Sequence, residues 1–433
     1  MNDLVSNAQD TSDERHAARR AALACMVTLA VALGIGRFAF TPLLPLMLHG
    51  AALGQPQIDI QHGGWLASFN YAGYFVGAVT CAALRVEPAR MVRLGLVTTV
   101  LLTLAMGVTS QFWVWALVRF IAGAVSAWTF VFASQWGLRR LAELGAHGWS
   151  GVIYTGPGVG IVGTGLLVSM MGGYGATPGW IGFGLIAAVA SAVVWPVFGA
   201  GSGAAFGAGA AATQGVVRPS GNPPAAAHAP RVPHRVAAGT HRIDAFWLVL
   251  LYGVPGFGYI ITATFLPVIA RHALPGSSWP DLFWPMFGAA LIVGALLAAR
   301  LPTHWDNRML LAGCYVLQAL GIGLGIVWPT AGGFSLGSVL IGLPFTAITL
   351  FAMREARRLR GEEAAGLMGY ATAAYGVGQI VGPLVAAPIA ERTGSFSLAL
   401  ALAAAALMIG AVGLVGVARW PRGRGRMPDC GCS

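Results

Sequence analysis

Hydrophobic positions recur along this chain in long, nearly unbroken runs that are separated by short polar segments. A helix needs about 20 apolar residues to cross the hydrocarbon core of a bilayer, because each residue adds about 1.5 Å of length. The pattern therefore predicts an all-α membrane protein. The twelve predicted spans are residues 21–48, 64–84, 91–110, 112–135, 149–171, 179–198, 243–270, 280–300, 308–328, 333–354, 365–389 and 396–418.

One stretch breaks this pattern between the sixth and seventh spans, at residues 199–242. It is rich in Gly, Ala, Pro, Arg and His and has no sustained periodicity, which is typical of a flexible linker. The pattern thus predicts one six-helix bundle at 21–198 and a second at 243–418. The polar ends, 1–20 and 419–433, are predicted cytoplasmic tails. The first apolar run is too long for a cleaved signal peptide.

Composition supports a multi-pass membrane protein. Hydrophobic residues make up 56% of the chain, charged residues make up 9%, and the mean hydropathy is +0.71. A soluble protein of this length could not cover so much apolar surface. The net charge of +11 does not indicate nucleic-acid binding, because the basic residues are spread over many short loops instead of forming one face.

The basic residues, all of them arginine, predict the orientation of the chain. With a cytoplasmic N-terminus, 22 of the 26 fall in cytoplasmic segments, whereas Arg271 and Arg392 fall outside and two fall within helices. Positively charged loops resist translocation across the membrane. We therefore expect both termini to be cytoplasmic. We also expect a monomer in the lipid bilayer of the bacterial cytoplasmic (inner) membrane.

Cysteine usage predicts neither a structural disulfide nor a metal site. Cys25, Cys81 and Cys314 fall in predicted membrane helices, and Cys430 and Cys432 end the chain. The terminal pair has no histidine beside it, so a tail is the better interpretation than a metal site. We expect no cofactor.

The two predicted bundles repeat a pattern of small residues. Segment 34–45 has Gly-x-Gly followed nine residues later by Pro, and segment 256–267 has the same spacing. The four glycines of segment 148–160 recur at identical spacing in segment 366–378. The first match pairs span one with span seven, and the second pairs span five with span eleven. This predicts a duplicated six-helix unit.

Six plus six spans, a cytoplasmic linker and repeated halves resemble the major facilitator superfamily of transporters. In span four, Arg119–Gly123 is similar to that superfamily's Arg-x-x-x-Gly element. Span five has a partial version of its Gly-Pro motif, at Gly156–Gly160. In span eleven the spacing of that motif is kept by Gly369, Gly378, Gly382 and Pro383, although Ala386 replaces the usual final Gly.

The cytoplasmic loops after spans two and eight resemble the gating loops of the same superfamily. The first carries Arg85 but lacks the expected Asp, whereas the second retains Arg300, Asp306 and Arg308. The resemblance implies that these side chains make gating contacts at the cytoplasmic side.

A narrower likeness lies in spans one and two. The segments 34–45 and 64–74 look like the YbfB/YjiJ group of bacterial transporters. The resemblance implies two pseudo-symmetric six-helix bundles that rock around a midplane site and expose it to alternate sides of the membrane.

Two arginines lie deep within predicted membrane spans, at Arg37 and Arg119. A charge at that depth costs roughly 3 kcal/mol on insertion scales and usually faces a cavity or a protein interior. A guanidinium binds carboxylate or phosphate through two hydrogen bonds and keeps its proton. We expect both to line a cationic central cavity. The alternative is that Arg119 braces carbonyl groups of span one and that Arg37 reaches the interface by snorkelling.

Polar and aromatic side chains in the same spans are expected to complete the binding site, because hydrogen-bonding groups are costly in lipid and turn inward. The candidates are Asn70, Tyr71, Tyr74, Ser126, Tyr154, Tyr259, Thr262, Tyr375 and Gln379.

Small residues and prolines indicate where helices slide and bend. Three Gly-x-x-x-Gly pairs, at 73–77, 156–160 and 378–382, have the spacing of close helix contacts, and ordinary tight packing is the alternative interpretation. Pro157 and Pro383 take corresponding places in the two halves, where each removes a backbone hydrogen bond. The predicted hinge residues are Gly156, Pro157, Gly160, Gly378, Gly382 and Pro383.

These features predict a secondary transporter for a small organic anion. All nine histidines and all the acids fall in loops, termini or span ends. The sequence therefore leaves open whether a proton or a counter-substrate is coupled to transport. Within transport, the alternative is efflux of hydrophobic or cationic compounds. A membrane-embedded enzyme is a second class, for which no catalytic motif is present, so we expect no enzyme activity. A receptor is a third class, for which no sizeable ligand domain is predicted.

Overall fold

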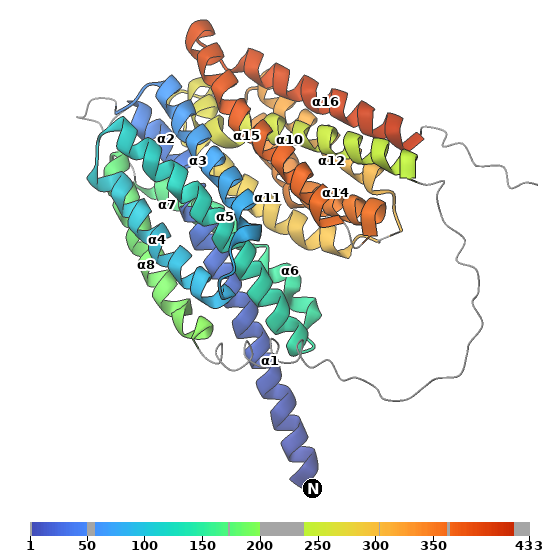
Figure 1. Cartoon of the computed structure of the whole chain (residues 1–433). Helices are drawn as coiled ribbons and strands as arrows, with labels where there is room; N and C mark the ends of the chain where they lie inside the picture. Colours follow the sequence, from blue (N-terminus) through green and yellow to red (C-terminus); the bar gives the residue numbers. More distant parts are fainter. Residues whose placement is uncertain are drawn as a thin grey trace, which may run out of the picture.

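The structure is a computed structural model that describes residues 2–49, 57–171, 174–199, 238–302, 304–361 and 364–419. Within these ranges every regular element is a helix, which confirms the predicted fold class. Figure 1 shows the first half, coloured blue to green, beside the second half, coloured yellow to red. The predicted linker and C-terminal tail, including Cys430 and Cys432, lie almost wholly outside the described residues.

The first half begins with a span made of three pieces. These are α1 (Asn2–Leu29), the π-helical η1 (Ala30–Ile35) and α2 (Phe40–His49). The remaining helices of this half are α3 (Ile60–Thr80), η2 (Cys81–Ala83), α4 (Pro88–Val108), α5 (Phe112–Glu143), η3 (His147–Trp149), α6 (Ser150–Ile153), α7 (Gly156–Met170), α8 (Ala176–Val194) and η4 (Trp195–Phe198). Helix α1 thus starts inside the predicted N-terminal tail.

The second half begins with one long helix, α10 (Ala238–Ala273), whose first residues belong to the predicted linker. It continues with α11 (Pro280–Arg300), α12 (Asn307–Val327), α13 (Ala331–Gly342), α14 (Phe345–Arg360), α15 (Ala364–Thr393) and α16 (Ser397–Arg419).

Eleven helical stretches of the described residues are long and apolar enough to cross a membrane. The remaining predicted span is the second, 64–84. It corresponds to helix α3, which starts and ends four residues earlier and is less apolar than the other eleven. Its 21 residues include Gln61, His62 and Asn70. Because α3 packs against both α5 of its own half and α15 of the other, the face that carries Asn70 is buried in protein and tolerates a polar residue.

Side chains cap the starts of several helices, where backbone N–H groups have no partner within the helix. Asp59 accepts a hydrogen bond of 2.7 Å from the N–H of His62 and so caps α3. Asp306 does the same for α12 at 2.8 Å, from the N–H of Arg308. Helix α7 instead has Pro157 in its first turn, where a missing N–H costs nothing.

Prolines inside helix α10 leave carbonyl groups free, and hydroxyl groups from other helices bind them. Pro255 cannot donate to Leu251, and the Tyr315 hydroxyl donates to that oxygen at 3.0 Å. Pro267 likewise cannot donate to Ala263, whose oxygen accepts a 2.9 Å bond from Thr41 of α2. The second bond joins the two halves of the protein.

Glycine contacts show that the halves are built alike, as the repeat predicted. A Cβ on Gly34 would collide with the backbone of Gly160, so η1 and α7 touch directly. In the second half a Cβ on Gly256 would collide with the carbonyl oxygen of Tyr375, and Gly378 lies against Phe257. Spans one and five therefore meet as spans seven and eleven do.

The halves meet along α3 with α15 and along α7 with α11. At the end that carries the α15–α16 loop, Gln61 hydrogen-bonds Glu391. Next along α3, a Cβ on Gly64 would lie 2.7 Å from the Cβ of Ala387, and Ser68 donates to the carbonyl of Ile380 at 2.9 Å. At the opposite end of α15, Gly366 has nothing within 4 Å of a Cβ. The contact between α3 and α15 thus runs from Gln61 and Glu391 to Phe75, which lies 2.9 Å from a Cβ on Gly376, and Gly366 lies beyond it.

Candidate functional site

Arg37 lies at a break in span one. The N–H groups of Gly36 and Phe38 bind carbonyl oxygens five residues back, Val31 and Leu33, both at 2.9 Å. This π-helical bond pattern opens into a turn before α2 begins. Such bulges occur frequently at functional sites. The turn places Arg37 in the protein interior, where it is 5% exposed.

The guanidinium of Arg37 contacts only a few groups, all of them neutral within the described residues. Its Nη2 donates to Oε1 of Gln379 at 3.0 Å. Its Cζ lies 4.1 Å from the ring centre of Tyr74, 5.1 Å from that of Tyr71 and 5.3 Å from that of Phe38. Its Nε is buried and has no hydrogen-bond partner among the described residues. Aromatic faces offset part of the cost of burying this charge, but no acid in contact neutralises it.

Gln379 continues this contact into the second half. Its Nε2 donates to the hydroxyl of Tyr259. The Tyr259 ring stacks on Tyr375 with a centroid distance of 5.9 Å, and Tyr375 stacks on Tyr252 at 5.0 Å. Arg37, Gln379 and Tyr259 therefore form one polar chain that crosses the boundary between the halves.

Tyr71 also crosses that boundary. Its hydroxyl shares a hydrogen bond of 2.9 Å with the hydroxyl of Thr264 on α10. Asn70, in contrast, stays within the first half, where its Nδ2 donates to the carbonyl of Arg119 at 2.9 Å. Neighbouring residues on α3 thus serve different contacts.

Arg119 makes the contacts of a brace. Its Nη1 lies 3.4 Å from the carbonyl oxygens of Gly36 and Arg37, and its Nη2 lies 3.3 Å from that of Arg37. Its guanidinium also covers the ring of Phe40 at 4.7 Å. These are the contacts of the alternative interpretation, in which Arg119 supports span one. A direct contact of Arg119 with a ligand remains a prediction.

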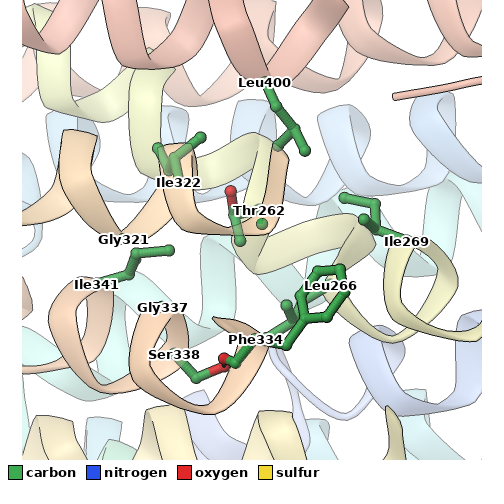
Figure 2. A pocket seen from close by; sticks show the side chains of 11 residues that line it. Thr262, Leu266, Ile269, Gly321, Ile322, Phe334, Gly337, Ser338, Ile341 and Leu400 are labelled. Atoms are coloured by element: carbon green, nitrogen blue, oxygen red, sulfur yellow. Dashed lines mark hydrogen bonds between the residues drawn. The ribbon is translucent and has the colours of Figure 1, made fainter. Parts of the chain in front are cut away.

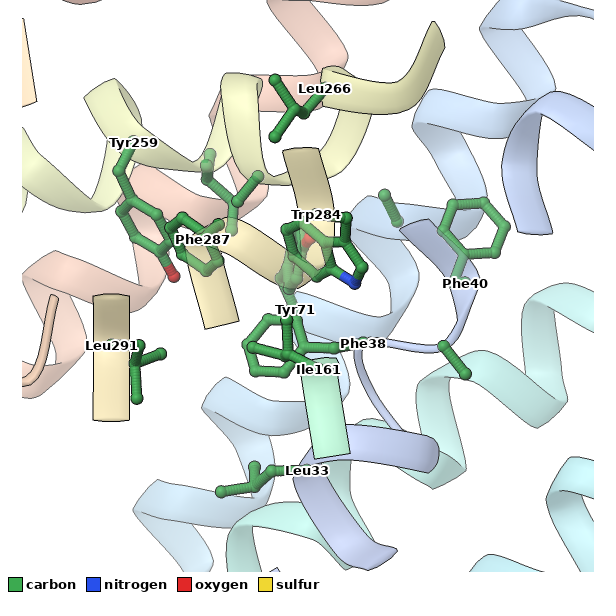
Figure 3. Close-up of a cluster of buried hydrophobic side chains, with 14 of the residues drawn as sticks. Leu33, Phe38, Phe40, Tyr71, Ile161, Tyr259, Leu266, Trp284, Phe287 and Leu291 are labelled. Carbon is green, nitrogen blue, oxygen red and sulfur yellow. The ribbon is translucent and has the colours of Figure 1, made fainter. Parts of the chain in front are cut away.

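Four aromatic side chains next to Arg37 form a closed ring of contacts, which we call the aromatic box: Phe38, Trp284, Phe287 and Phe345. Centroid distances around the box are 6.1 Å from Phe38 to Trp284, 5.1 Å to Phe287, 5.9 Å to Phe345 and 6.5 Å back to Phe38. Tyr259 meets Phe345 edge-on at 5.0 Å. Figure 3 shows Phe38, Trp284, Phe287 and Tyr259 within one cluster.

None of the four residues of the aromatic box was among the site residues predicted from the sequence. Its members are four of the 20 Phe and 14 Trp of the chain, so nothing in their type singles them out. A local signal existed for Phe345, since Pro344 precedes it and span ten breaks there into α13 and α14. Contacts with Phe38, from the other half, are decided only by tertiary packing.

Three predicted site residues make contacts that do not involve Arg37 or its neighbours. Ser126 donates to the carbonyl of Gly123 within α5, at 2.8 Å. Tyr154 packs against Phe130, at 6.2 Å between ring centres. Thr262 lines a cavity of about 20 Å³ inside the second half, between α10, α12, α13 and α16. Figure 2 shows it with Leu266 and Phe334. The cavity has room for about one water molecule.

The predicted hinge residues lie at close helix contacts. Gly156 faces the carbonyl of Met26, and Gly382 faces Ile260, each within one half. Span five breaks at Tyr154 and Thr155, immediately before Pro157. Pro383, in contrast, lies inside the continuous helix α15, and its carbonyl approaches Gly64 of the other half. A hinge role for these residues remains a prediction.

The predicted gating residues of the second half are partly buried. Arg308 is 3% exposed and pairs with Glu355 at 2.7 Å and with Asp244 at 3.0 Å. Arg358 also binds Glu355, at 2.8 Å. Neither Asp244 nor Glu355 was among the predicted gating residues, because they lie on α10 and α14, far from the loop in sequence. Arg85 and Arg300 are exposed, and Asp306 caps α12.

The comparison with protein families decides the class of this molecule. The model of the family described as "Uncharacterised MFS-type transporter YbfB" matches residues 29–222 and 205–415. The chain belongs to this family. It is a multi-pass membrane protein and a transporter of the major facilitator superfamily, which confirms the resemblance seen in the sequence.

A solved structure supports the fold. A point mutant of the nucleoside transporter NupG matches with a TM-score of 0.65 and 13% sequence identity, over 92% of this chain and 99% of that one. A search of the curated proteins finds no match.

Proposed function

We propose that this YbfB-type transporter moves a small organic anion by alternating access, with Arg37 as the main anion-binding group. The observation that carries the proposal is the environment of Arg37. It is buried at the junction of the halves, and among the described residues its Nε has no hydrogen-bond partner and its contacts are neutral. A buried cation of this kind attracts an anion, because each unpaired N–H lacks the hydrogen bond it would have in water.

The packing of the halves supports alternating access. Hydrogen bonds join them near the middle, at Arg37 with Gln379 and at Tyr71 with Thr264. The α3–α15 contact starts at the α15–α16 loop, whereas Gly366 and Gly369 at the other end of α15 lie beyond it and have free space beside them. We propose that the loop end is the outer side, that both termini are cytoplasmic in a bacterial inner membrane, and that this conformation is closed to the outside.

The residues proposed to line the site contact one another in this conformation, so a ligand must separate them. Gln379 is the residue to be displaced, since its amide oxygen occupies one N–H of Arg37. Arg119 supports the site through the backbone of span one, and Asn70 supports it through the carbonyl of Arg119 in span four.

Efflux of hydrophobic or cationic compounds is a second candidate function. The aromatic box favours it, because aromatic faces bind both apolar surfaces and cations. The uncompensated charge of Arg37, 5.3 Å from the Phe38 ring, disfavours cations.

Reconstitution into liposomes tests the proposal. Uptake of labelled carboxylates and phosphates is compared with uptake of uridine and of tetraphenylphosphonium, with and without a pH gradient or internal substrate. We expect anion uptake by the wild type and a loss of about 100-fold in Arg37→Ala, from the roughly 3 kcal/mol of a charged hydrogen-bonded pair.

Arg93→Gln is the matched control, because Arg93 covers the Trp195 ring at 5.4 Å, away from the contacts of Arg37. It should transport like the wild type. Cation or uridine flux without anion flux, unchanged in Arg37→Ala, would contradict the proposed substrate class. Uptake that depends on the pH gradient would indicate proton coupling, whereas uptake that depends on internal substrate would indicate exchange.

A further inference from the structure

The aromatic box and Arg37 adjoin each other through Phe38, whose ring belongs to the box and lies 5.3 Å from the Arg37 guanidinium. Trp284 of the box is fully buried, and its Nε1 has no hydrogen-bond partner in the part of the chain that the structure describes. A ligand at Arg37 therefore has a wall of aromatic rings beside its charged group and one further unused donor in that wall. This arrangement selects among anions.

The free N–H groups of the site fit one carboxylate. Neither Arg37 nor the nearby Arg119 contacts an acid among the described residues, but both Nη atoms of Arg119 lie at the carbonyl oxygens of Gly36 and Arg37. Arg37 therefore has the Nη group that a ligand can reach by displacing one side chain, Gln379. A carboxylate has two oxygens and one charge, whereas a phosphate monoester has three oxygens and about 1.5 to 2 charges at neutral pH. The third oxygen of a phosphate would be buried without a free Nη donor, which is costly.

The shape of the donor group also fits a carboxylate. A guanidinium presents two parallel N–H groups to the two oxygens of a carboxylate. In Arg37, Nη2 is occupied by the amide oxygen of Gln379 and Nε is unused. The Gln379 oxygen thus occupies the position where one carboxylate oxygen would bind, and the Nε–H is available to donate to the other carboxylate oxygen.

The aromatic box favours a ligand that bears a flat, aromatic ring. Ring centroids around the box are separated by 5.1 to 6.5 Å, in stacked, tilted and edge-on pairs. Aromatic pairs prefer these geometries at such distances and gain energy beyond the area they bury. A ligand ring that enters the box separates its rings and makes equivalent ring contacts with them. A short aliphatic acid has no ring and makes no such contacts. Phe38 comes from the first half and the other three rings from the second, so the ring would be held by both halves.

We infer that the substrate is a monocarboxylate that bears an aromatic ring. Its carboxylate binds Arg37 in place of the Gln379 oxygen, and its ring lies among Phe38, Trp284, Phe287 and Phe345. This inference rests on the proposed anion transport and names its substrate class.

Five probes with matched features test it, in binding to the purified full-length protein by calorimetry and in uptake by proteoliposomes. Benzoate carries the ring and the single charge. Cyclohexanecarboxylate keeps the size without the aromatic face, acetate lacks the body, phenyl phosphate adds charge, and benzamide removes it. We expect benzoate to bind about 10-fold more tightly than each of the others.

Two variants separate the parts of the site. Phe345→Leu keeps an apolar side chain in the box but removes a ring, so the preference for benzoate over cyclohexanecarboxylate should fall to about equal. Gln379→Glu places a carboxylate on Arg37, so benzoate binding should fall at least about 10-fold while benzamide binding is unchanged. Phe287→Leu replaces Phe345→Leu if the latter does not elute as a folded protein.

The outcomes are distinct. Transport of acetate or phenyl phosphate as well as benzoate would overturn the inference and leave anion transport standing. The same holds if Phe345→Leu and Phe287→Leu keep the full preference for benzoate. Flux of tetraphenylphosphonium or uridine with no flux of any anion would overturn both the inference and the proposed function.

Discussion

Spans one and seven start from the same sequence pattern and end in different structures. Both have Gly-x-Gly followed nine residues later by Pro. Span one breaks into α1, η1 and α2, whereas span seven is the single helix α10. The residue after the second glycine is Arg37 in span one and Tyr259 in span seven, and the two side chains meet on Gln379.

The difference shows how a repeated scaffold acquires one polar centre. The break in span one turns Arg37 inward and leaves the carbonyls of Gly36 and Arg37 to accept bonds from Arg119. Helix α10 needs no such brace, because its backbone stays helical past Tyr259, and its one free carbonyl near the centre, at Ala263, is bound by Thr41. The pattern of small residues thus sets the helix packing, while single polar residues set the asymmetry.

Removing the brace should have the largest effect on this comparison. Arg119→Ala leaves two buried carbonyls unpaired and a cavity in the core, so we expect a loss of about 3–5 kcal/mol in unfolding free energy. The measurement is thermal unfolding of the purified protein in detergent. Arg119→Lys keeps the charge and should lose less. If Arg119→Ala unfolded like the wild type, the broken span would not depend on a brace.

Glycine substitutions compare the two packing contacts directly. Gly34→Ala and Gly256→Ala each push a Cβ into the backbone of a neighbouring helix, so each should cost about 1–3 kcal/mol. Gly163→Ala is the control, since nothing lies within 4 Å of its Cβ, and it should be neutral or stabilise α7. Thermal unfolding reports all three. A large loss in only one half would mean that the halves are not packed alike.

The bond between Thr41 and Ala263 joins the two spans. Thr41→Val keeps the shape but removes the hydroxyl, and so leaves the carbonyl opposite Pro267 without a partner. We expect a loss of about 1 kcal/mol, measured by thermal unfolding. Thr41→Ser keeps the donor and should lose less. An equal loss in both variants would assign the effect to packing instead of to the hydrogen bond.

The smallest expected effect on stability concerns the N-terminal caps of spans two and eight, which follow spans one and seven in the chain. Asp59 caps α3, whereas the residue before α11, Trp279, makes no side-chain cap bond. Burial tends to raise the pKa of Asp59, but hydrogen bonds from the backbone and ring of His62 outweigh it, so its pKa is lowered. The cap thus adds stability above the unfolded pKa of about 3.9, and this is lost as pH falls through the lower folded pKa.

Unfolding temperatures between about pH 3 and pH 6 check this prediction. Asp59→Ala should cost about 0.5–1 kcal/mol at neutral pH. Asp59→Asn keeps an oxygen acceptor for the cap and should lose the pH dependence of that contribution. An Asn variant with the full pH dependence of the wild type would assign that dependence to another group.

Much of this molecule was predictable from its sequence because lipid simplifies the problem. Long apolar runs leave no alternative to membrane helices, since every backbone polar group must be bonded within its own segment. The segments 34–45 and 256–267 predicted the duplication, and Arg37, Tyr71, Tyr74, Tyr259, Tyr375 and Gln379 were predicted site residues that the fold brings together. Each of these polar side chains could be predicted from its own position, because a polar residue within an apolar span turns toward the protein interior.

The sequence alone determined the class of protein, the spans, the repeat and the presence of two buried cations. Tertiary structure decided which cation binds backbone carbonyls and which binds Gln379, because the partners of Arg119 and of Arg37 lie on other helices far apart in the chain. It also decided that Phe38 meets Trp284, Phe287 and Phe345, since apolar side chains carry no mark of their partner. Periodicity reports the environment of a residue, whereas its contacts depend on how the two halves dock.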